Sequence, residues 1–111
     1  MSPVVNIIQP SGTLDATQAT QLRQEVINLL AGGKKNILLL IDFRDVTFMD
    51  SSGLGALVQA TKMIRAVSGQ MFLCSLNQQV QMLLEMTSMN NAFQIYPNQE
   101  EFNKTVLSSI N

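Results

Sequence analysis

The 111-residue sequence contains no histidine and only one cysteine, Cys74. Without an imidazole, a Ser-His-Asp or Cys-His system is excluded, because nothing can serve as its base. A structural zinc site is disfavoured as well, so we expect no metal and no catalytic residue. Ser-Lys chemistry stays open in principle. However, the lysines nearest to Ser51 and Ser52, Lys35 and Lys62, fall on segments predicted to face solvent.

Charge and long apolar runs are also scarce. Only 14% of the residues are charged, the net charge is −1, and the basic residues do not cluster beyond Lys34-Lys35. Nucleic-acid binding needs a basic footprint, which is missing. The aliphatic run from Ile37 to Ile41 is far shorter than the roughly 20 residues of a spanning helix, and the N-terminus lacks a signal-peptide pattern. With a lone cysteine as well, we predict a cytoplasmic protein without membrane or nucleic-acid partners.

What is present is an ordinary globular composition, 46% hydrophobic, in a length that suits one domain, residues 1–111. Strand-like and helix-like patterns alternate four times along the chain. Strands are expected near residues 4–8, 36–42, 71–74 and 93–96, and a helix is expected after each. This alternation predicts an α/β fold with helical crossovers, that is, a mixed, mostly parallel sheet of about four strands with about four helices.

Local signals define several of these elements. Asp15, Asn77 and Asn98 stand at N-cap positions, and Gly32-Gly33 is typical of a helix end. The run at 37–41 does not alternate, which predicts a strand buried on both faces. Two further sets of residues have helical spacing: Phe102, Val106 and Ile110 in the last helix, and Met82, Met86 and Met89 after Asn77. Such a methionine stripe is typical of core filling, with an exposed partner surface as the alternative.

Residues 47–55, Thr-Phe-Met-Asp-Ser-Ser-Gly-Leu-Gly, join a strand-like run to a helical pattern. Ser51 and Ser52 fall where a helix exposes unpaired N–H groups. In a purely structural interpretation, a serine or aspartate caps the helix and the glycines permit a tight turn. A phosphate-binding glycine loop is a weaker interpretation, because Gly53-x-Gly55 lacks the third small residue of the dinucleotide fingerprint and the Walker spacing.

A third interpretation is regulation by phosphorylation of a serine in this turn. A phosphate would add about −1.5 to −2 charges. The helix N-terminus favours such an anion by roughly 0.3 to 1 kcal/mol. Asp50, at a distance of about 6 Å and an effective dielectric of about 20, would repel it by roughly 5 kcal/mol before screening. The added charge therefore acts mainly at an interface, where it must be desolvated against a partner.

The segment from Thr47 to Leu57 resembles the signature of STAS domains, in particular of bacterial anti-sigma factor antagonists. Gly12-Thr13-Leu14-Asp15 is similar to the family's Gly-x-Leu-Asp before its first helix. Lys35 to Phe43 resembles its central strand, and Met71 to Cys74 resembles the strand after its second helix. The resemblance implies a small α/β domain that is not an enzyme and needs no cofactor.

The resemblance also implies a partner-switching role. The unphosphorylated protein would bind a GHKL-type serine kinase that doubles as an anti-sigma factor, and so free the sigma factor. Phosphorylation of the second serine, which maps to Ser52, would break the complex, with Ser51 as second choice, and a PP2C-type phosphatase would reset it. The residues expected to bind the partner or support the site are Asp15, Asp50, Ser51, Gly53, Leu54 and Gly55.

Two departures from the family pattern stand out. Family members usually have one more strand before the segment at 4–8, and Thr13 stands where a glutamate is common. Two alternatives share the fold without the switch. One is a non-switching STAS subunit of a transport or signalling scaffold complex, and the other is a nucleotide-binding STAS module.

Overall fold

The computed structural model describes residues 4–108 of the chain. Within them the strands are β1 (Val5–Ile8), β2 (Ser11–Leu14), β3 (Leu38–Asp42), β4 (Asp45–Met49), β5 (Gln70–Cys74) and β6 (Gln94–Tyr96). The α-helices are α1 (Ala16–Leu30), α2 (Ser51–Ala66), α3 (Gln78–Met86) and α4 (Gln99–Phe102), and a π-helical segment, Asn103–Leu107, continues α4. The predicted α/β fold class is confirmed.

The main sheet has four strands in the order β1-β3-β5-β6, and every neighbouring pair is parallel. Strand β3 is buried along its whole length, as the uninterrupted apolar run predicted. Successive side chains point to opposite faces, so Leu39 and Ile41 join one apolar cluster while Leu38 and Leu40 join another.

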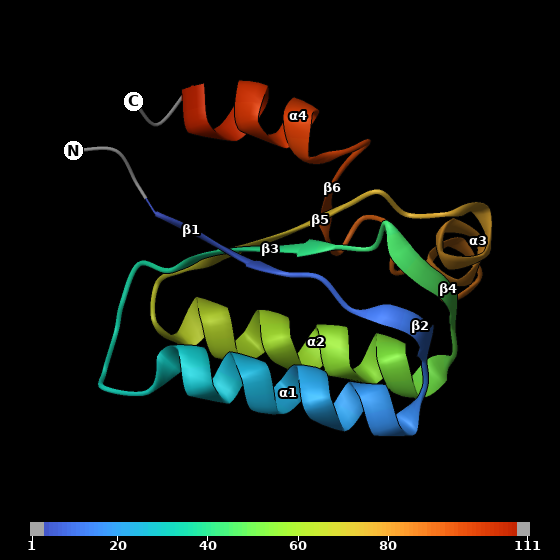
Figure 1. Cartoon of the computed structure of the whole chain (residues 1–111), viewed down its shortest axis with the longest axis horizontal. Coiled ribbons are helices and arrows are strands. Elements are labelled where there is room, and N and C mark those ends of the chain that lie inside the picture. The colour runs from blue at the N-terminus through green and yellow to red at the C-terminus, as the bar shows by residue number, and fades with distance from the viewer. Residues whose placement is uncertain (1–3, 109–111) are drawn as a thin grey trace.

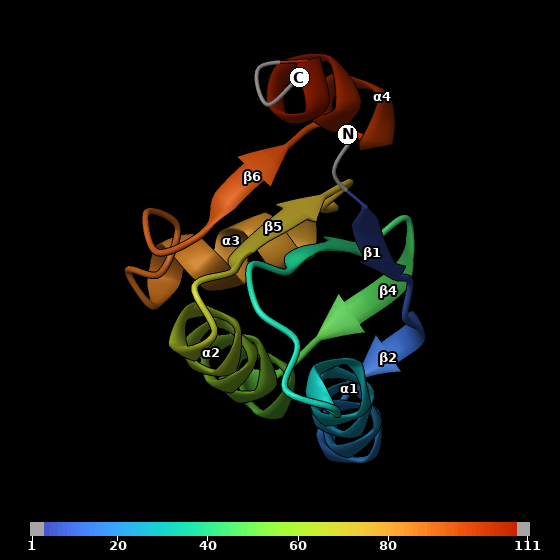
Figure 2. The ribbon, with the colours of Figure 1, turned by 90° about the vertical axis from the view of Figure 1, so that its left-hand side faces the viewer.

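Helices cover both faces of this sheet. Helices α1 and α2 lie side by side beneath it, and α4 lies on the opposite face (Figures 1 and 2). The cluster under α4 contains Phe102, whose ring stacks edge-on against Phe72 at 5.0 Å between centroids. The larger cluster packs the sheet against α1, α2 and α3. The main core therefore lies between the sheet and the helix pair that begins at the β2–β4 end.

The second sheet was not predicted. Strands β2 and β4 form a separate parallel pair at the end of the molecule where α1 and α2 begin (Figure 1). The sequence predicts no strand at 11–14, and in the structure three of the four residues of β2 are exposed while only Leu14 is buried. A strand with one buried residue has no alternating pattern to recognise.

The predicted helix signals are confirmed where the structure describes them. Asp15 accepts a hydrogen bond from the Gln18 N–H at 3.1 Å, and Asn77 accepts one from the Val80 N–H at 2.9 Å. The predicted stripe of the last helix has Phe102 and Val106 buried, and Ile110 lies outside the described residues. No helix in the described part of the chain is both long and apolar enough to cross a bilayer.

Candidate functional site: the first turn of α2

Two parallel strands end side by side at the candidate site. Leu14, the last residue of β2, pairs with Met49, the last residue of β4. The next residue in each chain segment is an aspartate, Asp15 or Asp50, and each aspartate starts a helix. The Asp50 N–H donates to the Leu14 carbonyl oxygen at 3.4 Å. The strand pairing thus brings Asp15 beside the turn that carries the two serines.

Asp50 caps α2 with its side chain. Its Oδ1 atom accepts hydrogen bonds from the Ser52 N–H at 2.9 Å and the Gly53 N–H at 3.2 Å. A side-chain cap of this kind is worth about 1 kcal/mol. Both bonds use Oδ1, so the cap leaves Oδ2 to other groups. The capping role that the sequence left open between aspartate and serine therefore belongs to Asp50.

Because Asp50 supplies the cap, the two serine hydroxyls are not needed for it. The Ser51 side chain is exposed to solvent, whereas Ser52 is half-buried. Both residues occupy the first turn of a helix whose N-terminal N–H groups attract anions. A modifying enzyme could therefore reach Ser51 without disturbing the core, and Ser52 with more difficulty.

The two glycines of this turn have different surroundings. Gly53 is buried, and a Cβ atom on it would lie 2.5 Å from the Leu14 carbonyl oxygen and 2.7 Å from the Met49 Cγ atom. Only a residue without a side chain lets α2 approach β2 this closely. Gly55 is exposed, and a Cβ atom there would meet nothing within 4 Å. Gly53 is thus a packing requirement, and Gly55 is not.

Leu54 lies on the inner side of the helix. It is only 8% exposed and belongs to the main core. The sequence predicts Leu54 among the residues that bind the partner or support the site, and its burial is consistent with support of the turn from the inside. The outward face of α2 carries instead Gly55, Gln59 and Lys62, which are all exposed.

Sequence reasoning missed one residue that shapes the site, Gln79 of α3. Its Oε1 accepts the Met49 N–H at 2.8 Å, and its Nε2 donates to the Met49 carbonyl oxygen at 2.8 Å. Asn77 Nδ2 donates to the carbonyl oxygens of Val46 and Thr47 at 3.1 and 3.2 Å. The side-chain amides of Gln79 and Asn77 thus hydrogen-bond backbone groups on the side of β4 that does not pair with β2, as a neighbouring strand would. No local pattern marks Gln79 for this contact, because its partner Met49 lies 30 positions away in the chain.

The site is acidic. The ion pairs seen among residues 4–108 join Lys104 to Glu100 and Glu101 on the last helix, so none of them neutralises Asp15 or Asp50. No group of three or more histidine, cysteine, aspartate or glutamate side chains in the described part could hold a metal ion. What the turn offers is an accessible hydroxyl beside two carboxylates at paired helix starts.

A model of the STAS domain family matches residues 2–102. The chain belongs to the STAS domain family. The resemblance read from Thr47 to Leu57 is thereby confirmed.

Individual proteins that are similar to this STAS domain are described as anti-sigma factor antagonists. It is 30% identical over 95 residues to the anti-sigma F factor antagonist of Paenibacillus polymyxa, covering 86% of this chain and 80% of that protein. A crystal structure from Thermotoga maritima, provisionally described as an anti-sigma factor antagonist, superposes with a TM-score of 0.80. That protein is 28% identical, and the match covers 92% of this chain and 86% of its own.

A more distant neighbour shows how widely the fold is used. A sulfate transporter family protein from Wolinella succinogenes superposes on this STAS domain with a TM-score of 0.77 at 16% identity, covering 98% of this chain and 87% of that one. At that identity the likeness shows the fold alone.

Proposed function

We propose that this STAS domain is an anti-sigma factor antagonist that binds its partner through the first turn of α2. Relatives that carry this name are similar over most of the chain. The observation that carries the proposal is the exposed Ser51 hydroxyl beside Asp50, in a turn whose cap does not use it. The partner in this proposal is a GHKL-type serine kinase that acts as the anti-sigma factor, and a PP2C-type phosphatase reverses the modification.

The acceptor is a serine of the Asp50-Ser51-Ser52 turn. The family resemblance puts Ser52 first. Accessibility favours Ser51, because Ser51 is exposed while Ser52 is half-buried and its N–H is held by Asp50. We therefore treat both as candidates, with Ser51 the one that a kinase reaches more easily. Asp50 directly precedes Ser51, and from this adjacency we infer that its Oδ2 atom, which the cap does not use, orients the hydroxyl or accepts its proton during transfer.

Phosphorylation at this turn acts by repulsion. A phosphate carries about −1.5 to −2 charges, and the N–H groups of Ser52 and Gly53 that would otherwise stabilise it are occupied by the Asp50 carboxylate. Solvent screens the resulting repulsion in the free protein. In a complex the same charges lose their water, so the modification weakens binding far more than it weakens the fold.

A nucleotide-binding role has less support. Gly53 and Gly55 lie inside the helix rather than in a loop, and Gly53 is packed against Leu14. Backbone N–H groups at the start of α2 would have to exchange the Asp50 carboxylate for a phosphate. Titrating ATP or GTP into the full chain should therefore give no saturable binding signal.

The decisive experiment mixes the full chain with its cognate kinase and ATP. Mass spectrometry of the wild type should place one phosphate on residue 51 or 52. Ser51→Ala and Ser52→Ala identify the acceptor, because the variant that loses it should no longer be released from the kinase. A phosphate on neither serine, together with tight binding that ATP does not change, would refute the switch. It would favour a scaffold or transport-subunit role.

A further inference from the structure

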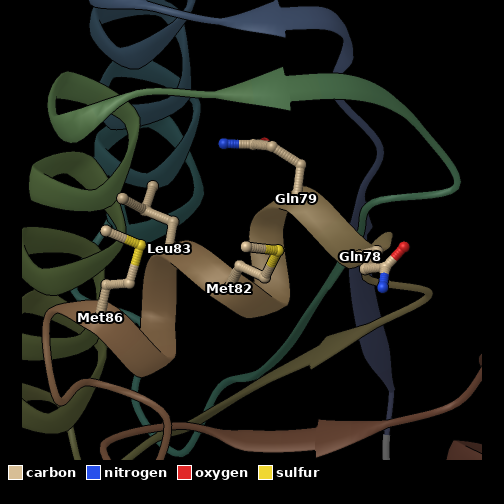
Figure 3. A pocket seen from close by; sticks show the side chains of 5 residues that line it. All are labelled: Gln78, Gln79, Met82, Leu83 and Met86. Atoms are coloured by element: carbon tan, nitrogen blue, oxygen red, sulfur yellow. The ribbon is translucent and has the colours of Figure 1, made fainter.

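Helix α3 carries an open apolar groove next to the α2 turn. Its walls are Gln78, Gln79, Met82, Leu83 and Met86, and it has a volume of about 390 Å³ (Figure 3). Figure 3 shows the Met86 sulfur pointing toward Leu83, while the Gln79 amide extends toward strand β4. The groove is thus formed by one helix face at the border of β4.

Two methionines of this groove are unusually exposed. Met82 is 52% exposed and Met86 is 79% exposed, whereas Met89 packs against the main core. Of the methionine stripe in the sequence, only Met89 therefore fills the core as expected. Methionine side chains are flexible and polarisable, and exposed ones are frequent at surfaces that bind proteins.

The groove is rigidly connected to the candidate switch. The paired hydrogen bonds between Gln79 and the Met49 backbone hold α3 against the residue that directly precedes Asp50. Asn77 fixes the start of α3 to β4 as well. The groove therefore adjoins the residue from which the α2 turn begins.

The charge of the surface narrows the choice of occupant. Helix α3 contains one charged residue, Glu85, and no lysine or arginine. Anionic lipid headgroups and nucleic acids would find no cation on it. The adjoining turn carries the carboxylates of Asp15 and Asp50, without an ion-pair partner among the described residues. The matching surface is that of a protein with a basic group toward the turn and a large apolar side chain toward α3.

We propose that the α3 groove is a second part of the interface with the anti-sigma factor, in which an apolar side chain of that protein seats between Met82 and Met86. This inference rests on the proposed function and extends it. The α2 turn senses phosphorylation through charge, while the α3 groove supplies contact that phosphorylation leaves unchanged. The groove thereby selects which anti-sigma factor is bound.

Photo-crosslinking in the source bacterium tests the placement. The full chain carries benzoylphenylalanine at one of three positions: Gln59 on the outward face of α2, Met86 in the groove, or Ile27 on α1. Ile27 is the matched control, because it is 49% exposed and lies on another helix. The same anti-sigma factor, identified by mass spectrometry, should be captured from positions 59 and 86 and not from position 27.

The outcomes separate the two claims. Capture from position 59 without capture from position 86 overturns the groove and leaves the proposed function standing. No anti-sigma factor at any position overturns both.

Affinity gives a second readout. With the captured partner, Met82→Ala/Met86→Ala and, separately, Met86→Glu should raise Kd at least about tenfold, and Ile27→Ala should not change it. Circular dichroism should show unchanged melting for all of these variants. Wild-type affinity in both groove variants would also overturn the groove.

Discussion

In each parallel sheet of this STAS domain, an aspartate lies at or directly after the carboxyl end of a strand. The surroundings of these aspartates differ between the two sheets. At the end of the main sheet, Asp42 is 1% exposed and accepts hydrogen bonds from the Arg44 N–H at 3.0 Å and Gln99 Nε2 at 2.7 Å. Cys74, at the end of β5, is fully buried. At the end of the β2–β4 pair, the half-buried Asp50 caps α2 and Ser51 is exposed.

The two carboxyl ends differ in the helix that lies next to each of them. Helix α4 lies over the main sheet (Figure 2), and the amide of its first residue, Gln99, donates to Asp42 Oδ2 at 2.7 Å. The β2–β4 pair is bordered by α3, whose Asn77 and Gln79 amides donate to backbone carbonyl oxygens of β4. Ligands and partners of open α/β sheets usually approach such carboxyl ends. Of these two ends, that of the smaller sheet exposes Ser51, whereas Asp42 and Cys74 at the end of the main sheet are buried.

The reactivity of Cys74 should report most clearly that the end of the main sheet is buried. Burial raises the pKa of its thiol to about 11, against an ordinary value of 9.0, and the charge of Asp42 adds to the rise. Because the thiolate is the reactive form, alkylation at pH 8 should be at least about a hundredfold slower in the folded protein than in urea. The folded state should also lose stability as the pH rises from 9 toward 11, since only the unfolded thiol ionises there.

Cys74→Ala is the control for that pH dependence and should flatten it. Equal alkylation rates in the folded and unfolded protein would show that reagent reaches the Cys74 thiol in the folded state.

Asp42→Ala should have the largest effect on stability. It removes a buried acceptor of two hydrogen bonds and leaves the Arg44 N–H and the Gln99 amide without a partner. Hydrogen bonds to charged groups are worth about 1.5 to 3 kcal/mol, so we expect a loss of about 3 kcal/mol in urea unfolding. Asp45→Ala removes an exposed acceptor, to which Gln9 donates, and should cost less than about 0.5 kcal/mol. Similar losses in the two variants would refute the contrast.

Gly53→Ala should be the next most damaging change. Its Cβ atom would overlap the Leu14 carbonyl oxygen, and forced overpacking costs about 1 to 3 kcal/mol. Gly55→Ala is a matched control in the same helix. There the Cβ atom has free space, so the better helix propensity of alanine should add about 1 kcal/mol.

Binding of the anti-sigma factor gives a second comparison between the wild type and Gly55→Ala. A Gly55→Ala protein that is more stable but binds the anti-sigma factor less well would show that the partner lies against this exposed glycine. Destabilisation by Gly55→Ala would contradict the open surroundings of that residue.

The two caps of the open edge differ by a smaller amount. Asp50 accepts two N–H groups and Asp15 accepts one. Loss of a cap costs about 0.5 to 2 kcal/mol, so Asp50→Ala should reach the upper part of that range and Asp15→Ala the middle. Thermal unfolding of the two variants measures the difference. A larger loss for Asp15→Ala would reverse our assignment of the stronger cap.

The sequence predicted local features of both sheets, but it did not predict the contacts between distant segments. The Asp50 turn was recognisable because cap, hydroxyls and glycines are consecutive, and the buried β3 was recognisable from its apolar run. The β2–β4 pairing and the Gln79–Met49 contact join residues far apart in the chain, 30 positions for the latter, and leave no local pattern. Gly53 shows the same limit, since its role comes from the distant Leu14 carbonyl group.

The smallest effect on stability should come from Ser51 and Ser52, the two candidate acceptors of the proposed switch. Ser51 is exposed and the cap bypasses its hydroxyl, so Ser51→Ala should change the free energy of unfolding by less than about 0.5 kcal/mol. Ser52→Ala should stay close to that value, because the Asp50 bond uses the backbone N–H of residue 52. If either variant unfolds readily, the hydroxyl has a structural role that the capping geometry does not explain. If both remain stable while one loses phosphorylation by the kinase, folding and switching use separate atoms of one helical turn.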